Sequence, residues 1–316
     1  MNPLSALYGA SVGLRNELYD RGTLSARRLQ APVVSVGSIS AGGAGKTPFL
    51  IMLGQLLQER GIAFNVLSRG YGRKTKGVRL VDPAGTAEGF GDEPLLIARN
   101  LGVPVIVGED RYAAGQLAEE KFGLQAHLLD DGFQHRRLAR DFDIALITQR
   151  DLHDTLLPAG RLRERLSSLA RASALVLMDD TPAEGIPVGP GQQVWRVTRS
   201  IVPPETKEAC FAFCGIARPE RFFTALGVAG VKVTGTRSLR DHHAYTAQDV
   251  EALYRQGHQS GATAFVTTGK DEVNLGPHAE RLRPLHVVPL HLEFEAGGES
   301  ALAQICAVIQ GRIKSA

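Results

Sequence analysis

The sequence predicts an α/β protein in which a parallel sheet carries a phosphate-binding loop and a second, smaller α/β lobe follows. Up to residue 178, short and nearly continuous apolar runs alternate with helical patterns, as expected for strands that helices cover on both faces. A glycine-rich turn follows the first run, and Lys46 and Thr47 open the next helix. With 316 residues, 43% of them hydrophobic, the chain can bury enough surface for two domains.

The first part of the chain contains the expected strands of the sheet, at residues 33–37, 63–68, 103–108, 126–130, 142–147 and 174–178. The helices expected between them include residues 48–60, 93–101 and 111–122. Right-handed crossovers would place the loops after these strands at one edge of the sheet, which is where ligands bind in such folds.

A stretch rich in proline and glycine, residues 180–193, is the expected linker. We therefore expect a phosphate-binding domain at 1–185 and a smaller lobe at 186–316. The smaller lobe has expected strands of its own, at residues 210–216, 231–236, 263–268 and 287–294. A final helix at 300–314 fits against either lobe.

The turn after the first strand has the composition of a phosphate cradle. Gly42, Gly43 and Gly45 lack Cβ atoms, so backbone N–H groups can converge on an anion at the start of the helix. In a P-loop, Lys46 reaches the β and γ phosphates and Thr47 offers its hydroxyl to Mg²⁺. An ordinary strand-to-helix turn is the alternative. The octet departs from the GxxxxGK[ST] pattern only at its first position, so the predicted nucleotide-binding residues are Ser40, Ala41, Gly42, Gly43, Ala44, Gly45, Lys46 and Thr47.

Carboxylates follow two other predicted elements. The strand at 126–130 ends in Asp130 and Asp131, an arrangement that resembles a Walker B metal site and suits Mg²⁺. A turn-capping aspartate is the alternative there. Asp92 and Glu93 precede a proline, and this pattern by itself is typical of a helix start as well as of a catalytic carboxylate.

Basic loops offer further candidates, each with a simpler alternative. The loop SRGYGRKTKG suits the binding of an anionic substrate, or it is a solvated surface loop. Arg111 is placed to reach phosphoryl oxygens, or it forms a surface ion pair. Glu164 supports the metal, or it pairs with neighbouring arginines. In the second lobe, Asp241 and the two histidines after it favour acid–base chemistry, although a capped helix starts just beyond them.

Composition excludes several classes of protein. A formal net charge of +3 is too small for a general nucleic-acid binder. Three cysteines give no disulfide framework and favour a reduced, cytosolic compartment. No apolar run reaches the roughly 18 to 20 residues that cross a bilayer. The first 28 residues combine apolar side chains at helical spacing with arginines, which predicts either a helix in the membrane interface or a helix docked on the core.

Considered together, these motifs resemble one family. SAGGAGKTP, SRGYGR, GDEP, LLDDGFQH, LPAGRLRE, DHHAYT and TGKD occur in this order over nearly the whole chain, and the set resembles the lipid A disaccharide 4′-kinase (tetraacyldisaccharide 4′-kinase) family. The resemblance implies a P-loop NTPase-like domain and a smaller lobe that close around ATP. It also implies transfer of the γ-phosphoryl group to the 4′-hydroxyl of a tetraacylated glucosamine disaccharide 1-phosphate, forming lipid IVA in lipid A biosynthesis.

The resemblance assigns roles residue by residue. Lys46 and Thr47 would serve nucleotide and metal, and Asp130 and Asp131 the Mg²⁺ site. Asp92 would activate the hydroxyl together with a histidine, and position directly after Asp241 favours His242 over His243. Supporting candidates are Glu93, Arg111, Glu164, Asp241, Arg69, Tyr71 and Arg73. The implied setting is peripheral, on the cytoplasmic face of the bacterial inner membrane, with the lipid disaccharide as partner, no nucleic acid, and a monomeric protein.

A second hypothesis comes from a different class of protein. A P-loop ATPase can act as a switch whose hydrolysis changes partner binding without phosphorylating a small molecule. Analysis of the products separates the two, because a kinase consumes ATP in proportion to phosphorylated lipid.

Overall fold

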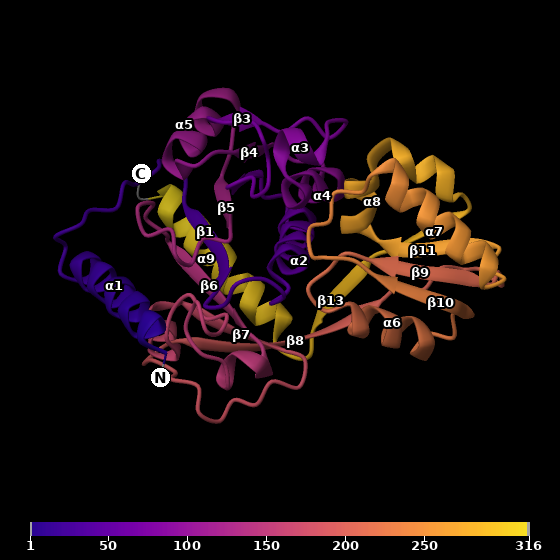
Figure 1. Cartoon of the computed structure of the whole chain (residues 1–316). Helices are drawn as coiled ribbons and strands as arrows, with labels where there is room; N and C mark the ends of the chain where they lie inside the picture. Colours follow the sequence, from indigo (N-terminus) through magenta and orange to yellow (C-terminus); the bar gives the residue numbers. More distant parts are fainter. Residues whose placement is uncertain (1, 315–316) are drawn as a thin grey trace.

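A nine-stranded sheet forms the centre of the larger lobe in the computed structural model, which describes residues 2–314 (Figure 1). The strand order is β13-β8-β7-β6-β1-β5-β2-β4-β3. The strands are β1 (Val33–Ser38), β2 (Phe64–Ser68), β3 (Arg79–Leu80), β4 (Val105–Val107), β5 (Ala126–Asp130), β6 (Phe142–Ile147), β7 (Ala174–Met178), β8 (Gln193–Ile201) and β13 (Leu290–Phe294).

All strands from β8 to β4 in this order pair in parallel, and the two edge strands β13 and β3 are antiparallel. Strands β1, β2, β5, β6 and β7 are buried at every position, because helices cover both faces of the sheet. This confirms the predicted α/β class with a parallel sheet. The carboxyl ends of β1, β5 and β2 therefore meet at one edge, where the P-loop lies.

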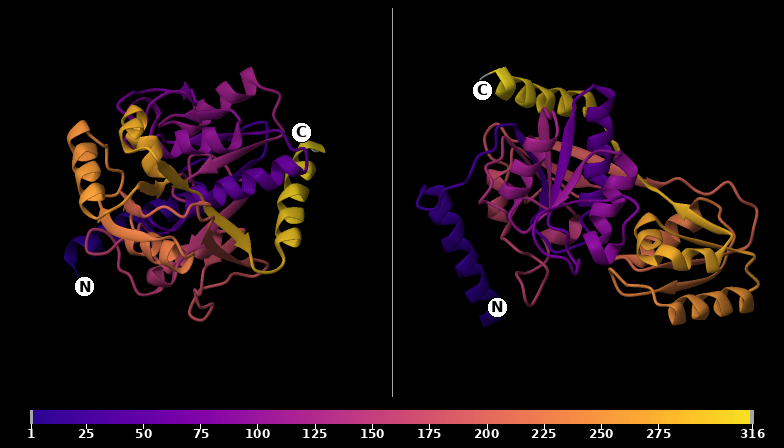
Figure 2. Two further views of the ribbon diagram at one scale, coloured as in Figure 1. Left: turned by 90° about the vertical axis from the view of Figure 1, so that its right-hand side faces the viewer. Right: turned by 90° about the horizontal axis from the view of Figure 1, so that it is seen from above.

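Helices of the larger lobe enclose this sheet. They are α1 (Pro3–Asp20), α2 (Lys46–Glu59), α3 (Ala87–Phe90), α4 (Asp92–Leu101), α5 (Arg111–Lys121) and α9 (Gly298–Lys314), with short 3₁₀ turns η1 (Gln149–Leu152) and η2 (Leu166–Arg171). Phe49 and Leu53 of α2 share one core cluster with Ile305 of α9. Figures 1 and 2 show α1 on the side of this lobe that faces away from the smaller lobe. Among the described residues, no helix is both long enough and apolar enough to cross a membrane.

The smaller lobe contains a four-stranded parallel sheet in the order β10-β9-β11-β12. Its elements are β9 (Cys210–Cys214), α6 (Pro219–Val228), β10 (Val233–Ser238), α7 (Ala247–Gln259), β11 (Ala264–Thr268), α8 (Gly269–Leu275), η3 (Gly276–Leu282) and β12 (Leu285–Val288). Helix α8 packs against α4 of the larger lobe. This contact brings the ends of the two helices together beside the P-loop edge.

The strand pairing corrects the expected division of the chain. Strand β8 was not predicted, and it joins the large sheet although it follows the expected linker. The single strand expected at 287–294 is two strands, and its second half, β13, returns to the large sheet beside β8. The last helix, left open by the sequence, packs on the larger lobe. Assigning the strands after residue 185 to the smaller lobe was therefore wrong for β8 and β13, because pairing between distant strands leaves no local trace in the sequence.

Candidate active site

The P-loop connects β1 to α2 at the carboxyl edge of the sheet. Gly42, Gly43 and Gly45 have φ angles of 69°, 71° and 88°, in the left-handed region where a side chain is strained. At Gly43 a Cβ would also lie 3.2 Å from the Arg161 guanidinium. The turn therefore needs glycine for both conformation and space. Thr47, in the first turn of α2, is buried beneath the loop.

Arg161 holds this loop in shape. Its Nη2 donates to the carbonyl oxygens of Ala41 at 2.7 Å and Gly42 at 2.5 Å, and its own carbonyl accepts from the Ala41 N–H at 2.9 Å. These bonds satisfy carbonyls of the loop and, apart from the Ala41 N–H, leave its N–H groups for an anion. Arg161 was not among the site residues predicted from the sequence. Its place in the LPAGRLRE motif was the only signal.

Lys46 contacts a carboxylate at the end of the neighbouring strand β5. Its Nζ lies 3.4 Å from Asp131 Oδ1, and Arg163 Nη1 donates to Asp131 Oδ2 at 2.7 Å. Burial acts to raise the pKa of Asp131, but the charges of Lys46 and Arg163 outweigh it and hold the pKa below its usual range. Asp131 is therefore ionised beside the P-loop. Arg163 is a second residue of the site that was not predicted from the sequence.

Asp130 has a carboxylate oxygen that is available to bind a cation. Its Oδ2 accepts from the Ser68 hydroxyl at 2.8 Å, whereas its Oδ1 is buried with no hydrogen-bond partner in residues 2–314. Burial, and then the charges of Glu93 and Asp131, raise its pKa to about 7. No group of three or more His, Cys, Asp or Glu side chains is placed to hold a metal in the part of the chain that the structure describes. A cation here would need oxygens from water or phosphate as well, which is the usual coordination of Mg²⁺.

Asp92 and His242 meet across the two lobes. Asp92 begins α4 and is buried, and His242 lies in the loop before α7 with φ 57°. His242 Nδ1 is 2.8 Å from Asp92 Oδ2. His243 instead bonds Asp249 at 3.1 Å. The geometry thus selects His242, as the order of residues after Asp241 suggested.

Helix α8 adds two polar residues to this pair. Lys270 Nζ lies 3.1 Å from His242 Nε2 and 3.8 Å from Asp92 Oδ2, and Asn274 Nδ2 donates to Asp92 Oδ2 at 3.2 Å. Burial acts to raise the pKa of Asp92, but the His242 hydrogen bond and the Lys270 charge outweigh it, so the pKa is lowered. The hydrogen bond to Asp92 raises the pKa of His242 against burial and the charge of Lys270. Lys270 lies in the TGKD motif but was not selected as a site residue, and Asn274 carried no signal.

These shifts predict how the Asp92–His242 contact responds to pH. Because the folded pKa of His242 is raised above 6.5, its stabilisation is fully present below that value and is lost as the pH rises through the folded pKa. We expect His242→Ala to reduce the free energy of unfolding more at about pH 5.5 than at about pH 9. Urea unfolding of both proteins at the two pH values measures this. Strain from φ 57° is independent of pH and cancels; an equal reduction at both would contradict the prediction.

The supporting candidates separate into two groups. Asp241 lies at the site, because its Oδ1 accepts from Lys270 Nζ at 3.0 Å and its Oδ2 is 3.9 Å from where a Cβ on Gly42 would be. The ring of Tyr71 lies 5.6 Å from that of His242. Glu93 raises the pKa of Asp130, and Arg111 is buried among Arg69, Asp130 and Asp131, where burial and then Arg69 lower its pKa.

Two candidates are engaged elsewhere. Arg73 donates to Glu109 at 2.8 Å and to the carbonyl of Gly77 at 2.8 Å, which ties down its own loop. Glu164 was expected to support the metal or to pair with neighbouring arginines. Its oxygens instead accept from Arg171, seven residues on, and from Asn16 and Gln134, so it does not face the P-loop. The placement of Glu164 at the metal is therefore wrong, because its carboxylate is already saturated by these donors.

A P-loop on a parallel sheet, two carboxylates at the next strand end, and an Asp–His pair closed by a second lobe define a P-loop kinase. The family model for LpxK, tetraacyldisaccharide-1-P 4′-kinase, matches residues 1–309. The chain belongs to this family.

Individual relatives and a solved structure support this membership of the family. The chain is 49% identical to a tetraacyldisaccharide 4′-kinase of Koribacter versatilis over 99% of both chains, and 39% identical to one of Aquifex aeolicus over 86% of this chain and 88% of the relative. A crystal structure of apo-form LpxK from Aquifex aeolicus in complex with ATP superposes with a TM-score of 0.79 at 34% identity, covering 97% of this chain and 98% of that one.

Proposed function

We propose that this protein transfers the γ-phosphoryl group of ATP to the 4′-hydroxyl of a tetraacylated glucosamine disaccharide 1-phosphate, forming lipid IVA. The observation that supports this most directly is the 2.8 Å contact between Asp92 and His242, which joins a buried carboxylate of the larger lobe to a histidine of the smaller lobe. A nucleotide switch needs a P-loop and a metal site but has no use for a base steadied by a second lobe. The kinase hypothesis therefore accounts for more of the geometry.

Each residue then has a defined task. Asp92, ionised because its pKa is lowered, accepts the proton of the attacking hydroxyl, and His242 and Asn274 hold its Oδ2 in place. Lys46 moves from Asp131 to the β and γ phosphates and neutralises charge that develops during transfer. The amides of the P-loop bind the phosphates, and Arg161 keeps these amides oriented. Closure of the smaller lobe excludes water from the γ-phosphate.

We propose that Asp130, Asp131 and Thr47 hold Mg²⁺. The buried, unpaired Oδ1 of Asp130 and the anionic Asp131 fit a hard cation. Mg²⁺ bound there would neutralise phosphate charge and help to orient the nucleotide.

This assignment predicts a change in the response to magnesium. Asp130→Asn and Asp131→Asn should each raise the Mg²⁺ concentration that gives half-maximal activity by about 10-fold or more, because each replaces a charged ligand with a neutral one. The measurement is a Mg²⁺ titration of initial rates at saturating ATP. Asp82→Asn, at an exposed aspartate, is the control. Titrations that match the control for both variants would show that these residues only shape the turn.

The exposed side chains of helix α1 support a location of this protein at the membrane surface. Its apolar Leu4, Leu7 and Leu14 point outward, while Ser5 and Gly9 are buried against the body. A helix that docks on a core shows the opposite pattern, with polar residues outside. We propose that α1 lies in the interface of the cytoplasmic face of the bacterial inner membrane, where the acyl chains of the substrate reside.

Substitutions on that face test the anchor. Leu7→Ser with Leu14→Ser should reduce sedimentation with anionic vesicles by about 10-fold, since two apolar side chains are lost from the interface. The control is Val188→Ser with Val228→Ser, which are 50% and 86% exposed compared with 70% and 59% for the two leucines. If the double leucine variant sediments with vesicles as well as the control does, α1 is not the anchor.

Transfer of radiolabelled γ-phosphate from ATP to the lipid disaccharide in detergent micelles tests the proposed function. We expect labelled lipid in proportion to the ATP consumed. ATP hydrolysis without labelled lipid would favour the switch hypothesis.

A further inference from the structure

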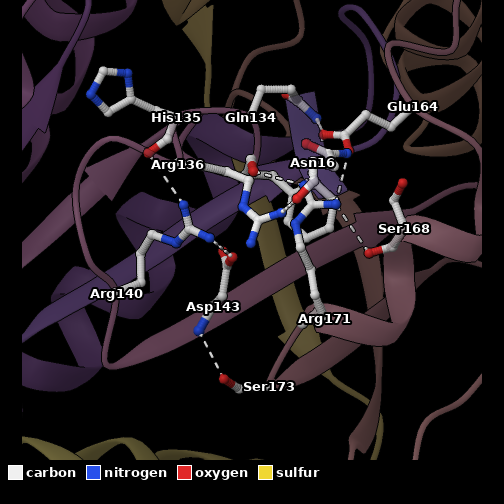
Figure 3. Close-up of polar contacts among 12 residues, drawn as sticks. Asn16, Gln134, His135, Arg136, Arg140, Asp143, Glu164, Ser168, Arg171 and Ser173 are labelled. Carbon is white, nitrogen blue, oxygen red and sulfur yellow. Dashed lines mark hydrogen bonds and ion pairs between the residues drawn. The ribbon is translucent and has the colours of Figure 1, made fainter. Parts of the chain in front are cut away.

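A hydrogen-bonded network joins α1 to the middle of the larger lobe. Asn16 Nδ2 donates to Glu164 Oε2 at 2.5 Å, and Gln134 Nε2 donates to Glu164 Oε1 at 3.0 Å. Arg171 binds both oxygens of the same carboxylate, each at 2.8 Å. Figure 3 shows these side chains gathered around Glu164. A helix with an exposed apolar face is thus fixed to the body by polar contacts.

The network continues to the P-loop edge. Gln134 Oε1 accepts from Arg163 Nη1 at 3.2 Å, and the same nitrogen donates to Asp131 Oδ2 at 2.7 Å. Asp131 is the carboxylate that contacts Lys46. The position of one guanidinium therefore depends on Gln134, and the position of Gln134 depends on Glu164.

A second contact reaches Arg163 directly. The hydroxyl of Tyr8, two turns before Asn16 on α1, donates to the backbone carbonyl of Arg163 at 3.2 Å. Helix α1 therefore holds this arginine at its backbone through Tyr8 and at its guanidinium through Asn16, Glu164 and Gln134. Asn16 lies on the helix face opposite to the exposed leucines, and Tyr8 lies at the side of that face, one turn after Leu4.

Burial and charge indicate that the network orients groups rather than supplying charge. Glu164 is only 1% exposed, and although burial acts to raise its pKa, Arg171, Asn16 and Gln134 lower it, so it is ionised. Arg171 balances this charge. Asn16 is neutral, so its amide adds no charge and only orients the Glu164 carboxylate. Buried hydrogen-bond networks of this kind fix side-chain geometry.

We propose that Tyr8 and Asn16 are positioning residues for phosphoryl transfer. Through them α1, besides resting on the membrane, holds the Arg163 guanidinium in contact with Asp131. This inference depends on the proposed function of the site. It means that the helix in contact with the lipid also orders the catalytic centre.

The test measures kcat and the KM for ATP in detergent micelles for Tyr8→Phe, Asn16→Ala and the double variant. One hydrogen bond of about 1 kcal/mol corresponds to about a fivefold change in rate, so each single variant should lose about fivefold in kcat. The KM for ATP should stay within about twofold, because the P-loop amides are untouched. Ser11→Ala, an exposed hydroxyl on the same helix, is the control and should keep the wild-type kcat.

A double-mutant cycle separates positioning from a general loss of structure. In an Arg163→Ala background the Tyr8→Phe and Asn16→Ala losses should disappear, since the residue through which they act is gone. Equal losses in both backgrounds, or no loss in either, would overturn the inference. Tyr8→Phe preserves packing, so this arm stays informative even if Asn16→Ala unfolds, which thermal melting reports. Wild-type protein that labels no lipid would instead refute the proposed function.

Discussion

Lys46→Ala should lower kcat for phosphoryl transfer by about 10³-fold, at the upper end of the usual effect of removing one charge-stabilising donor. Lys46 starts α2 at the end of the P-loop, and its only acidic contact among the described residues is Asp131 at 3.4 Å. The amine is thus free to exchange one weak ion pair for the β and γ phosphates. Because the polar contacts of this amine in the described part of the chain are a 3.4 Å ion pair and a 3.5 Å hydrogen bond to Ser38 Oγ, we expect the loss to fall on transfer rather than on folding.

The measurement combines radiolabel transfer with thermal unfolding. Lys121→Ala, at an exposed lysine on α5, controls for the loss of one surface positive charge and should keep activity within about twofold. A folded Lys46→Ala protein with near wild-type turnover would remove the P-loop assignment, and the proposed kinase reaction with it.

Asp92→Ala should lower kcat by about 10³-fold, within the usual range for removing a general base. His242→Ala should have a smaller effect, because Asn274 and Lys270 still contact the carboxylate. If the pair performs one proton-transfer step, the double variant should lose little more than Asp92→Ala alone. ATP affinity should be unchanged in all three.

A double-mutant cycle with separate ATP-binding measurements decides this. His243→Ala is the matched control, since that histidine bonds Asp249 and not Asp92. Losses that multiply would mean that Asp92 and His242 act independently. An unchanged kcat for Asp92→Ala would mean that Asp92 only starts helix α4 and has no catalytic role.

Much of the site was predictable because its residues follow strands of one parallel sheet. The carboxyl ends of β1 and β5 must meet, so Lys46 and Asp131 were expected together, and they lie 3.4 Å apart. The glycines of the P-loop were predictable for a similar local reason, since consecutive positive φ angles demand them. Asp92 and His242 were linked only by the family resemblance, since each pattern alone also fits a helix start.

The residues that were missed act through contacts between distant segments. Asn274 reaches Asp92 across 182 positions, and Arg161 reaches Ala41 across 120. Such contacts depend on how α8 packs against α4 and on how the loop after β6 folds back. Glu164 is the opposite case, a residue that was predicted at the site but is bonded elsewhere. It lies in a motif that resembles an active-site sequence, yet tertiary packing directs its carboxylate toward Asn16 and Arg171.

The α/β class, the P-loop, the candidate carboxylates for Mg²⁺ and the family were all readable from the amino-acid sequence. Local rules suffice for these, because strand periodicity, glycine conformation and motif spacing are properties of adjacent residues. Three features depend on the folded protein: β8, β13 and α9 return to the larger lobe, the favoured His242 is the histidine that contacts Asp92, and Tyr8 of α1 bonds the backbone of Arg163. Side-chain direction and long-range pairing depend on the packing of whole elements, which no single segment specifies.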